Sequence, residues 1–215
     1  MRPDGGVMVK VCGLTVPSEA AACARLGLWG IGVVFAAGSP RQVGVEEAAA
    51  VCAAVPEGVA KVGVFVATAP GALAETARHV GLTHLQIHGD VDPAEARAAS
   101  GLPVIQGIRM DGPGGVARAR ASAADLVLLD AAVGGRDGGT GTTFVWGLLD
   151  AEPLGRPFAL AGGLTPENVA AAVRRTAPAL VDVSTGVESA PGRKDAALVA
   201  AFVAAVAGAG VGVAA

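Results

Sequence analysis

Two residues with acid–base side chains, Cys12 and Asp130, each end a short apolar segment. Cys12 lies in Lys10-Val-Cys-Gly13, and Asp130 closes Leu126-Val-Leu-Leu-Asp130. A thiol whose pKa is lowered by its surroundings can act as a nucleophile or accept a proton. A carboxyl group whose pKa is raised by burial can donate one. The structural alternatives are a small buried hydrophobic residue for Cys12 and a cap or loop residue for Asp130.

Two further apolar segments stop in glycine-rich turns. Phe158-Ala-Leu-Ala-Gly-Gly163 and Leu180-Val-Asp-Val-Ser-Thr-Gly186 are both followed by polar residues. Glycines at strand ends let backbone N–H groups approach an anion, and a following helix adds partial positive charge. A pair of such turns after the last two strands is typical of the phosphate site of a (β/α)8 barrel. The turns therefore indicate a phosphorylated small-molecule ligand.

Other strand ends carry residues suited to holding a substrate. Arg41, in Gly38-Ser-Pro-Arg41, suits a substrate carboxylate, with a solvated surface arginine as the alternative. His88 ends a run in which His84 and Gln86 share its face, and it can position substrate. The His, Cys and acidic residues lack the spacing of a zinc motif, so no metal site is predicted.

Strand alternation places Lys10 on the same side as Cys12. A lysine inside a barrel needs a partner for its charge. Asp182, on the adjacent last strand, is the predicted partner of Lys10.

The elements that must position these residues alternate along the chain. Strands alternating with helices favour a parallel sheet with right-handed crossovers. Eight such units predict an α/β fold, a closed (β/α)8 TIM barrel, with an open doubly wound sheet as the fallback. We expect one domain over residues 1–215, frayed at 1–6 and 208–215. The predicted strands are Val7–Cys12, Leu28–Ala36, Ala60–Val66, Thr83–His88, Pro103–Arg109, Asp125–Asp130, Phe158–Gly162 and Leu180–Ser184. The predicted helices are Pro17–Leu26, Val45–Val55, Pro70–Val80, Asp92–Ser100, Pro113–Ala123, Thr143–Leu149, Pro166–Thr176 and Lys194–Ala207.

Composition narrows the class of function. The 215 residues are 52% hydrophobic with a net charge of -3 and no run of basic residues, which argues against nucleic-acid binding. No apolar stretch reaches the roughly 18 residues of a membrane span, and the N-terminus lacks an apolar signal core. Three cysteines without CxxC spacing favour a reducing, cytoplasmic setting. The glycine-rich segment 134–141 suits either a mobile lid or a solvated loop.

An ordered set of motifs runs from about residue 9 to residue 203, nearly the whole chain. The motifs are Lys10-Val-Cys-Gly13, Gly38-Ser-Pro-Arg-Gln-Val43, Val62-Gly-Val-Phe-Val66, Leu85-Gln-Ile-His-Gly89, Leu128-Leu-Asp130, Gly138-Gly-Thr-Gly141 with Phe144 and Trp146, Leu160-Ala-Gly-Gly-Leu164 with Pro166-Glu-Asn-Val169, and Asp182-Val-Ser-Thr-Gly-Val-Glu188 with Pro191-Gly-Arg-Lys-Asp195. The glycine turns occur in many phosphate-binding barrels, whereas the ordered set is highly specific. The set resembles the phosphoribosylanthranilate isomerase family of tryptophan biosynthesis.

The resemblance implies an Amadori rearrangement of N-(5-phosphoribosyl)anthranilate without metal or organic cofactor. It implies Asp130 as general acid, Cys12 as general base and Arg41 as the partner of the anthranilate carboxylate. It further implies a phosphate cradle formed by Gly162, Gly163, Ser184, Thr185 and Gly186. His88 and Asp182 are two further predicted substrate-binding residues. The expected partner is the phosphorylated substrate, with no nucleic acid or membrane, and the chain is expected to be a monomer or a homodimer.

Four positions depart from the family pattern, namely Ala67, Gln106, Val145 and Thr185, where Asn, Lys, Asp and Ser are usual. The first two can retune substrate fit, so a paralogue acting on a related aminoaldose phosphate in a specialised pathway is an alternative. The histidine-pathway isomerase of similar chemistry differs by a carboxylate in place of Cys12 and by two similar half-barrels. A non-catalytic barrel that binds a phosphorylated ligand is the alternative of another class.

Overall fold

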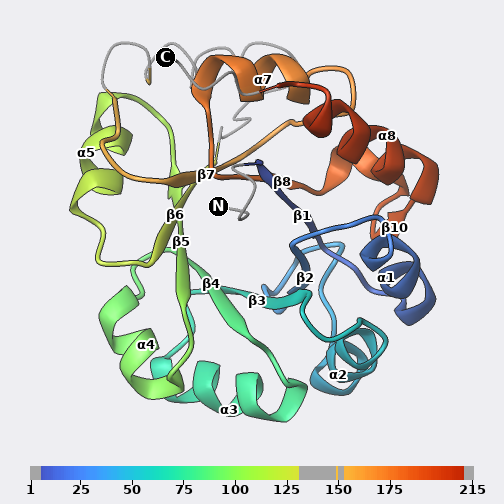
Figure 1. Cartoon of the computed structure of the whole chain (residues 1–215). Helices are drawn as coiled ribbons and strands as arrows, with labels where there is room; N and C mark the ends of the chain where they lie inside the picture. The colour runs from blue at the N-terminus through green and yellow to red at the C-terminus, as the bar shows by residue number, and fades with distance from the viewer. Residues whose placement is uncertain (1–5, 131–148, 150–152, 211–215) are drawn as a thin grey trace.

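The computed structural model describes residues 6–130, 149 and 153–210. Eight parallel strands close into a barrel in chain order, and β8 pairs with β1 to complete the ring (Figure 1). Each predicted apolar run contains one strand, so the closed barrel is confirmed and the open sheet was wrong. The strands are β1 (Met8–Cys12), β2 (Gly30–Val34), β3 (Ala60–Val66), β4 (His84–His88), β5 (Val104–Arg109), β6 (Leu126–Asp130), β7 (Phe158–Ala161) and β8 (Leu180–Val183).

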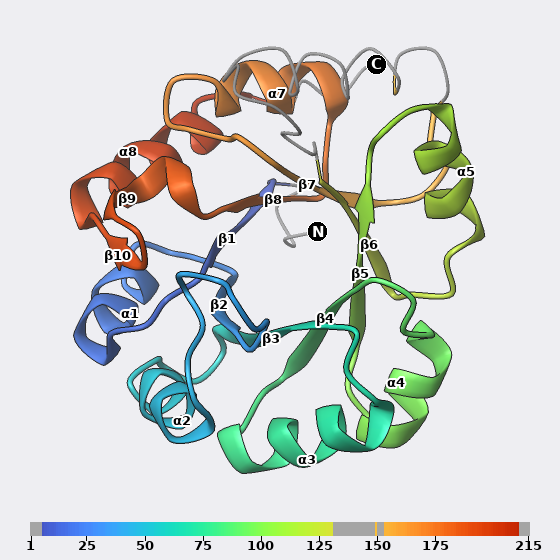
Figure 2. The same ribbon diagram turned by 180° about the vertical axis from the view of Figure 1, so that it is seen from behind.

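Helices surround the ring of strands, as the views from both ends of the barrel show (Figures 1 and 2). Proline lies in the first turn of four of them, where its missing N–H has no helical partner to lose. Of the predicted helix 143–149, only Leu149 lies within the described residues, and it is helical and buried. The helices are α1 (Pro17–Ala24), α2 (Val45–Ala53), α3 (Pro70–Val80), α4 (Pro93–Ser100), α5 (Pro113–Ala121), α7 (Val169–Thr176) and α8 (Ala196–Ala207).

Three apolar clusters of described residues hold the barrel together. The largest lies between the strands and the helices, a second lies in the barrel interior, and a small third one contains Cys12, Val34 and Val64. Val62, Ile105, Leu128 and Leu180 belong to the interior core. Because side chains alternate along each strand, the next inward residues lie one layer closer to the carboxyl ends of the strands. The interior therefore combines an apolar cluster with the buried polar side chains of Lys10, Gln86 and Asp182.

The chain between β8 and α8 differs from the prediction. A 3-10 turn (η1, Thr185–Val187) leads into a hairpin of β9 (Glu188–Ala190) and β10 (Arg193–Lys194). Helix α8 begins at Ala196 rather than Lys194, because the Asp195 carboxylate accepts hydrogen bonds from the N–H groups of the first turn, at 2.8 Å and 3.2 Å. This places Lys194 in the hairpin, outside the helix.

Helix α7 also begins later than predicted. It starts at Val169, three residues after Pro166, because Asn168 bridges the preceding turn. Its Oδ1 accepts from the Thr165 N–H at 2.8 Å, and its Nδ2 donates to the Gly163 carbonyl at 2.9 Å. The asparagine thus fixes the glycine turn that follows β7.

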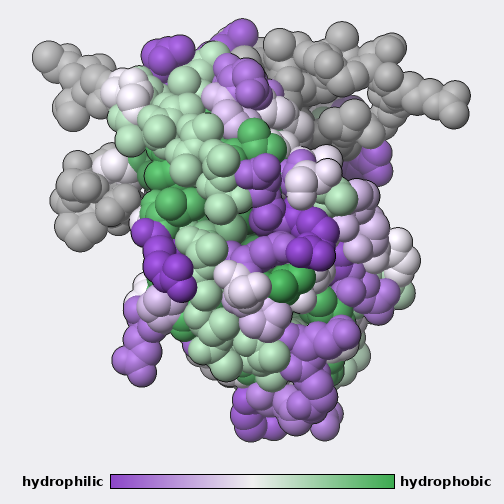
Figure 3. All heavy atoms as spheres, turned by 90° about the vertical axis from the view of Figure 1, so that its right-hand side faces the viewer, coloured by the Kyte–Doolittle hydropathy of each residue, from purple (hydrophilic) through white to green (hydrophobic). Residues whose placement is uncertain are grey.

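The face formed by α8, α1 and α2 mixes hydrophilic and hydrophobic residues (Figure 3). Among the described residues, the large hydrophobic side chains that are exposed are Val45 and Val66. Within residues 6–130, 149 and 153–210, no helix is long and apolar enough to cross a membrane.

Replacing Ala177 with glycine is expected to stabilise the fold by about 1 kcal/mol. Ala177 ends α7 in the left-handed conformation, with φ at 45°, whereas α3 and α4 end in the same region at Gly81 and Gly101. A side chain disfavours this conformation, and Ala177 is exposed, so its removal costs little packing. Thermal unfolding would show a rise of roughly 2–4 °C, and an unchanged or lower midpoint would contradict the argument.

Candidate active site

Four neighbouring strands carry the predicted site. Asp130 ends β6 and Cys12 ends β1, and β7 and β8 with their glycine turns lie between them in the ring. The carboxyl ends of parallel barrel strands meet at one mouth. The thiol and the carboxyl group therefore flank the two turns at the same end of the barrel.

Asp130 is largely buried at this mouth. Burial raises the pKa of its carboxyl group, and the nearby His88 opposes that shift. On the neighbouring strand β5, Arg109 is the register partner of Asp130. A carboxyl group with a raised pKa keeps its proton to higher pH than an ordinary aspartate, as a general acid requires.

The predicted pairing of Lys10 with Asp182 is confirmed. The Lys10 ammonium is fully buried and donates to both Asp182 carboxylate oxygens, at 3.0 Å and 2.9 Å. The two residues are register neighbours on β1 and β8. Burial lowers the pKa of Lys10, but Asp182 opposes it and the net shift is upward. Asp182 therefore lies one layer below the mouth, as the partner of the buried Lys10 ammonium. A contact between Asp182 and the substrate stays a prediction.

Cys12 and Lys10 share the space beside Gly32. A Cβ atom at Gly32 would lie 2.9 Å from the Cys12 sulfur and 3.2 Å from the Lys10 nitrogen. Burial raises the pKa of Cys12, and the Lys10 ammonium opposes that rise. The glycine leaves room for the thiol and the ammonium to lie close together, where the cation favours the thiolate.

The two glycine turns pack against each other. Gly162 and Gly163 have φ values of 89° and 65°, in the left-handed region open to glycine. A Cβ at Gly186 would overlap the Leu164 carbonyl of the neighbouring turn. Ser184 fastens its turn to β1, because its hydroxyl donates to the Cys12 carbonyl at 3.0 Å. The predicted phosphate residues are thus brought together beside Cys12.

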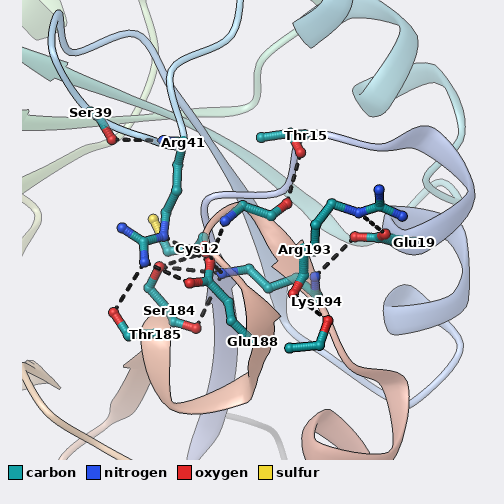
Figure 4. Close-up of polar contacts among 12 residues, drawn as sticks. Cys12, Thr15, Glu19, Ser39, Arg41, Ser184, Thr185, Glu188, Arg193 and Lys194 are labelled. Atoms are coloured by element: carbon teal, nitrogen blue, oxygen red, sulfur yellow. Dashed lines mark hydrogen bonds and ion pairs between the residues drawn. The ribbon is translucent and has the colours of Figure 1, made fainter.

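Arg41 reaches the same corner from the loop after β2. Its Nε and Nη2 donate to Glu188 at 2.8 Å and 2.6 Å, and Nη2 also donates to the Thr185 hydroxyl at 3.2 Å (Figure 4). A Cβ at Gly13 would overlap the Arg41 side chain, so this glycine lets the arginine cross over the end of β1. The guanidinium lies beside the predicted phosphate turn, with 19% of its side chain exposed.

His88 lies beside Asp130, away from this corner. Gln86 holds its ring, with 2.9 Å between the amide nitrogen and Nε2. Burial lowers the pKa of His88, and Asp130 opposes that shift, so the ring is neutral at neutral pH. A neutral imidazole at the mouth can exchange hydrogen bonds with a sugar hydroxyl or with Asp130.

A cavity of about 1170 Å³ opens on the Asp130 side of the mouth. Its lining includes His88, Arg109, Asp130 and Gly162, and it continues along the end of α4 and α5. Cys12 and Arg41 lie beyond this cavity, on the far side of the two turns. Asp130 therefore borders this cavity, whereas Cys12, Arg41 and the turn after β8 are not part of its lining.

The four departures from the family pattern occupy different surroundings. Ala67 follows β3 in the left-handed region, with φ at 48°, and its N–H donates to the His88 carbonyl. Gln106 alternates with the inward Ile105 and accepts from the Ser122 hydroxyl at 2.6 Å, and both residues line the cavity beside Asp130, so its effect on substrate fit stays a prediction. Thr185 accepts from Arg41. Val145 lies outside the described residues, as does the predicted lid segment 134–141.

Sequence reasoning assigned no role to two residues of this corner, Glu188 and Lys194. Both belong to the unpredicted hairpin, and both side chains are almost fully buried and paired at 2.6 Å. In the sequence, these residues are marked only by the charged residues of Val187-Glu188 and Pro191-Gly-Arg-Lys-Asp195. Which of these charges pair with each other becomes clear only when the hairpin is seen. In the described part of the chain, no group of three or more His, Cys, Asp or Glu side chains could hold a metal ion.

Comparisons with known proteins agree on one family. The family model described as N-(5'phosphoribosyl)anthranilate (PRA) isomerase matches residues 9–205. An N-(5'-phosphoribosyl)anthranilate isomerase from Rubrobacter xylanophilus is 45% identical over 200 residues, covering 92% of this chain and 97% of the relative.

Two solved structures have the same barrel. A phosphoribosyl anthranilate isomerase in complex with reduced 1-(o-carboxyphenylamino)-1-deoxyribulose 5-phosphate is 31% identical, with a TM-score of 0.80 over 94% of this chain and 99% of the other. An isomerase from Thermotoga maritima, described as monomers generated from a dimeric enzyme, is 31% identical with a TM-score of 0.82 over the same shares. The chain therefore belongs to the N-(5'-phosphoribosyl)anthranilate isomerase family, enzymes of tryptophan biosynthesis.

Proposed function

We propose that the chain converts N-(5-phosphoribosyl)anthranilate to 1-(2-carboxyphenylamino)-1-deoxyribulose 5-phosphate, with Asp130 as general acid and Cys12 as general base. The observation that carries these roles is the placement of a buried carboxyl group and a buried thiol on either side of the two glycine turns. The reaction moves two protons and needs no change in the oxidation state of the enzyme.

Asp130 acts in the first step. Its proton passes to the furanose ring oxygen, the bond from that oxygen to C1′ breaks, and a Schiff base forms between C1′ and the anthranilate nitrogen. Burial raises the pKa of Asp130, which keeps the proton available for transfer. The neutral His88 beside it can orient the carboxyl group or a sugar hydroxyl.

Cys12 acts in the second step. Its thiolate removes the proton from C2′, which gives an enolamine that tautomerises to the ketone. The Lys10 ammonium opposes the effect of burial on the pKa of the Cys12 thiol, whereas the Asp182 carboxylate adds to it, so the support for the thiolate comes from the lysine.

The remaining residues hold the substrate. The phosphate fits the backbone N–H groups of Gly162, Gly163, Thr185 and Gly186, together with Ser184, because the first N–H groups of a helical turn have no partner within the helix. Arg41 would bind the anthranilate carboxylate beside that turn. The similar enzyme in complex with reduced 1-(o-carboxyphenylamino)-1-deoxyribulose 5-phosphate supports a ligand that carries both a phosphate and a carboxylate. Contacts between Asp182 and substrate stay a prediction. The oligomeric state, monomer or homodimer, also stays a prediction, and the dimeric relative from Thermotoga maritima favours a homodimer.

The dependence of kcat/KM on pH is expected to be bell-shaped, with limbs set by Asp130 and Cys12. The active form has a protonated carboxyl group and a deprotonated thiol. A carboxyl group ordinarily ionises before a thiol, so this form is a constant minor fraction between the two pKa values and declines outside them. Burial raises both pKa values, so both limbs lie at higher pH than for a free aspartate and a free cysteine.

The test is a fluorescence assay that follows consumption of freshly generated phosphoribosylanthranilate by the wild-type chain across this pH range. Turnover with both limbs supports the assignment. A folded wild-type chain without turnover would refute the substrate and favour a related aminoaldose phosphate or a binding role. Turnover whose acid limb stays at the ordinary pKa of aspartate would contradict the role of Asp130.

A further inference from the structure

We propose that Glu188 and Lys194 are positioning residues for this reaction, which aim Arg41 at the substrate carboxylate and fasten the phosphate turn of β8. The proposal rests on the proposed function and adds two residues to which that mechanism gives no step. Neither needs to touch the reacting atoms, because both act through side chains that touch the substrate.

Glu188 fixes the plane of the Arg41 guanidinium. Its two carboxylate oxygens accept from Nε and Nη2 at 2.8 Å and 2.6 Å, a two-point contact that defines direction as well as distance. The Gly192 N–H also donates to Glu188, at 3.2 Å, which holds the carboxylate within the hairpin. Among the contacts of the described residues none uses Nη1 of Arg41, so that edge can bind a substrate carboxylate.

Lys194 ties the same carboxylate to the phosphate turn. Its side chain is fully buried, and its Nζ donates to Glu188 at 2.6 Å and to the carbonyl and hydroxyl oxygens of Ser184 at 3.1 Å and 3.3 Å. The Ser184 hydroxyl in turn contacts the Cys12 carbonyl. The close-up shows one continuous set of contacts from Arg41 through Glu188 and Lys194 to the end of β1 (Figure 4).

The charges explain why two cations share one carboxylate. A pair of Arg41 and Glu188 alone would be neutral, and a neutral corner attracts an anionic substrate weakly. Lys194 adds a second positive charge, so the cluster of three side chains carries a net charge of +1 next to the predicted phosphate and carboxylate positions. Glu188 therefore orients Arg41 while the cluster still attracts an anionic substrate. The cost of burying the Glu188 carboxylate is offset by its ion pairs with Arg41 and Lys194.

The first test is Glu188→Gln, which keeps the shape of the side chain but removes its charge. Because Arg41 holds the substrate in the ground state and the transition state alike, we expect KM to rise about tenfold or more while kcat changes far less. Arg193→Ala is the matched control on the same hairpin, because the exposed Arg193 side chain donates to Glu19 and to neither Glu188 nor Ser184, and Glu19 keeps its hydrogen bond from the Lys194 N–H in this variant. An unchanged KM in Glu188→Gln would overturn the proposal.

A double-variant cycle separates positioning from mere folding. If Glu188 acts through Arg41, Glu188→Gln should add little to the KM of Arg41→Ala, whereas independent structural effects would add. Lys194→Met should raise KM and also slow alkylation of Cys12 at a fixed pH, because it removes a charge that favours the thiolate. Additive effects on KM, or unchanged alkylation in a folded Lys194→Met, would contradict the assignment. Wild-type turnover is measured in parallel, so failure of the proposed function and failure of this inference are distinguishable.

Discussion

Replacing Asp130 with asparagine is expected to lower kcat/KM by about 100- to 10,000-fold, and replacing Cys12 with alanine by a similar factor. Asparagine keeps the size of the aspartate but has no transferable proton, and alanine removes the proton acceptor. Both losses should fall mainly on kcat, because proton transfer is a transition-state interaction and the phosphate and carboxylate contacts stay in place. The fluorescence assay with purified variants measures both constants.

The matched control for Cys12 is Cys52→Ala. Cys52 is a buried free thiol in α2, on the outside of the barrel and away from its mouth. Burial raises the pKa of Cys52 to about 11, so the thiol stays protonated at neutral pH. Its replacement should leave kcat unchanged. Asp130→Asn should also unfold at no lower denaturant concentration than wild type, because it removes a charge whose burial is unfavourable. Full turnover by either folded site variant would refute its catalytic role. A wild-type chain that does not turn over substrate, and whose ligand binding survives both substitutions, would favour the non-catalytic barrel.

Breaking the ion pair inside the barrel is expected to have the largest effect on stability. Lys10→Met leaves the Asp182 carboxylate buried without its cation, and Asp182→Leu leaves the Lys10 ammonium without its anion. Loss of one member of a buried pair typically costs about 3–5 kcal/mol. Urea denaturation of the two single variants should show lower midpoints with little change in slope.

The double variant Lys10→Met with Asp182→Leu tests the physical reason. It removes both charges, so it should recover most of the stability lost in either single variant. Arg118→Ala is the control, since its ion pair with Asp111 is about half exposed and contributes little. Additive losses in the double variant would show that the cost arises from packing and not from an unpaired charge.

A good part of the site could be predicted from the sequence because it depends on local pattern. Apolar runs alternating with helices locate the strand ends, and the barrel rule gathers those ends at one mouth. Cys12 and Asp130 are found in this way, as are the glycine turns. The pairing of Lys10 with Asp182 follows from alternation on two strands that ring closure makes neighbours. The roles of these residues in catalysis remain predictions for the assays above.

The order of the eight units, the strand ends and the family motifs could be predicted from the sequence, since each depends on residues that are neighbours in the chain. The partners of Arg41 could be identified only in the folded chain, because Glu188 lies 147 positions away, in a short hairpin without a regular alternation of apolar residues. The tertiary structure also decided that Gln106 faces Ser122 and that Lys194 leaves its predicted helix, because side-chain direction and a capping aspartate depend on the exact register. Local periodicity positions backbone elements, whereas contacts between loops of different units form only when the barrel closes.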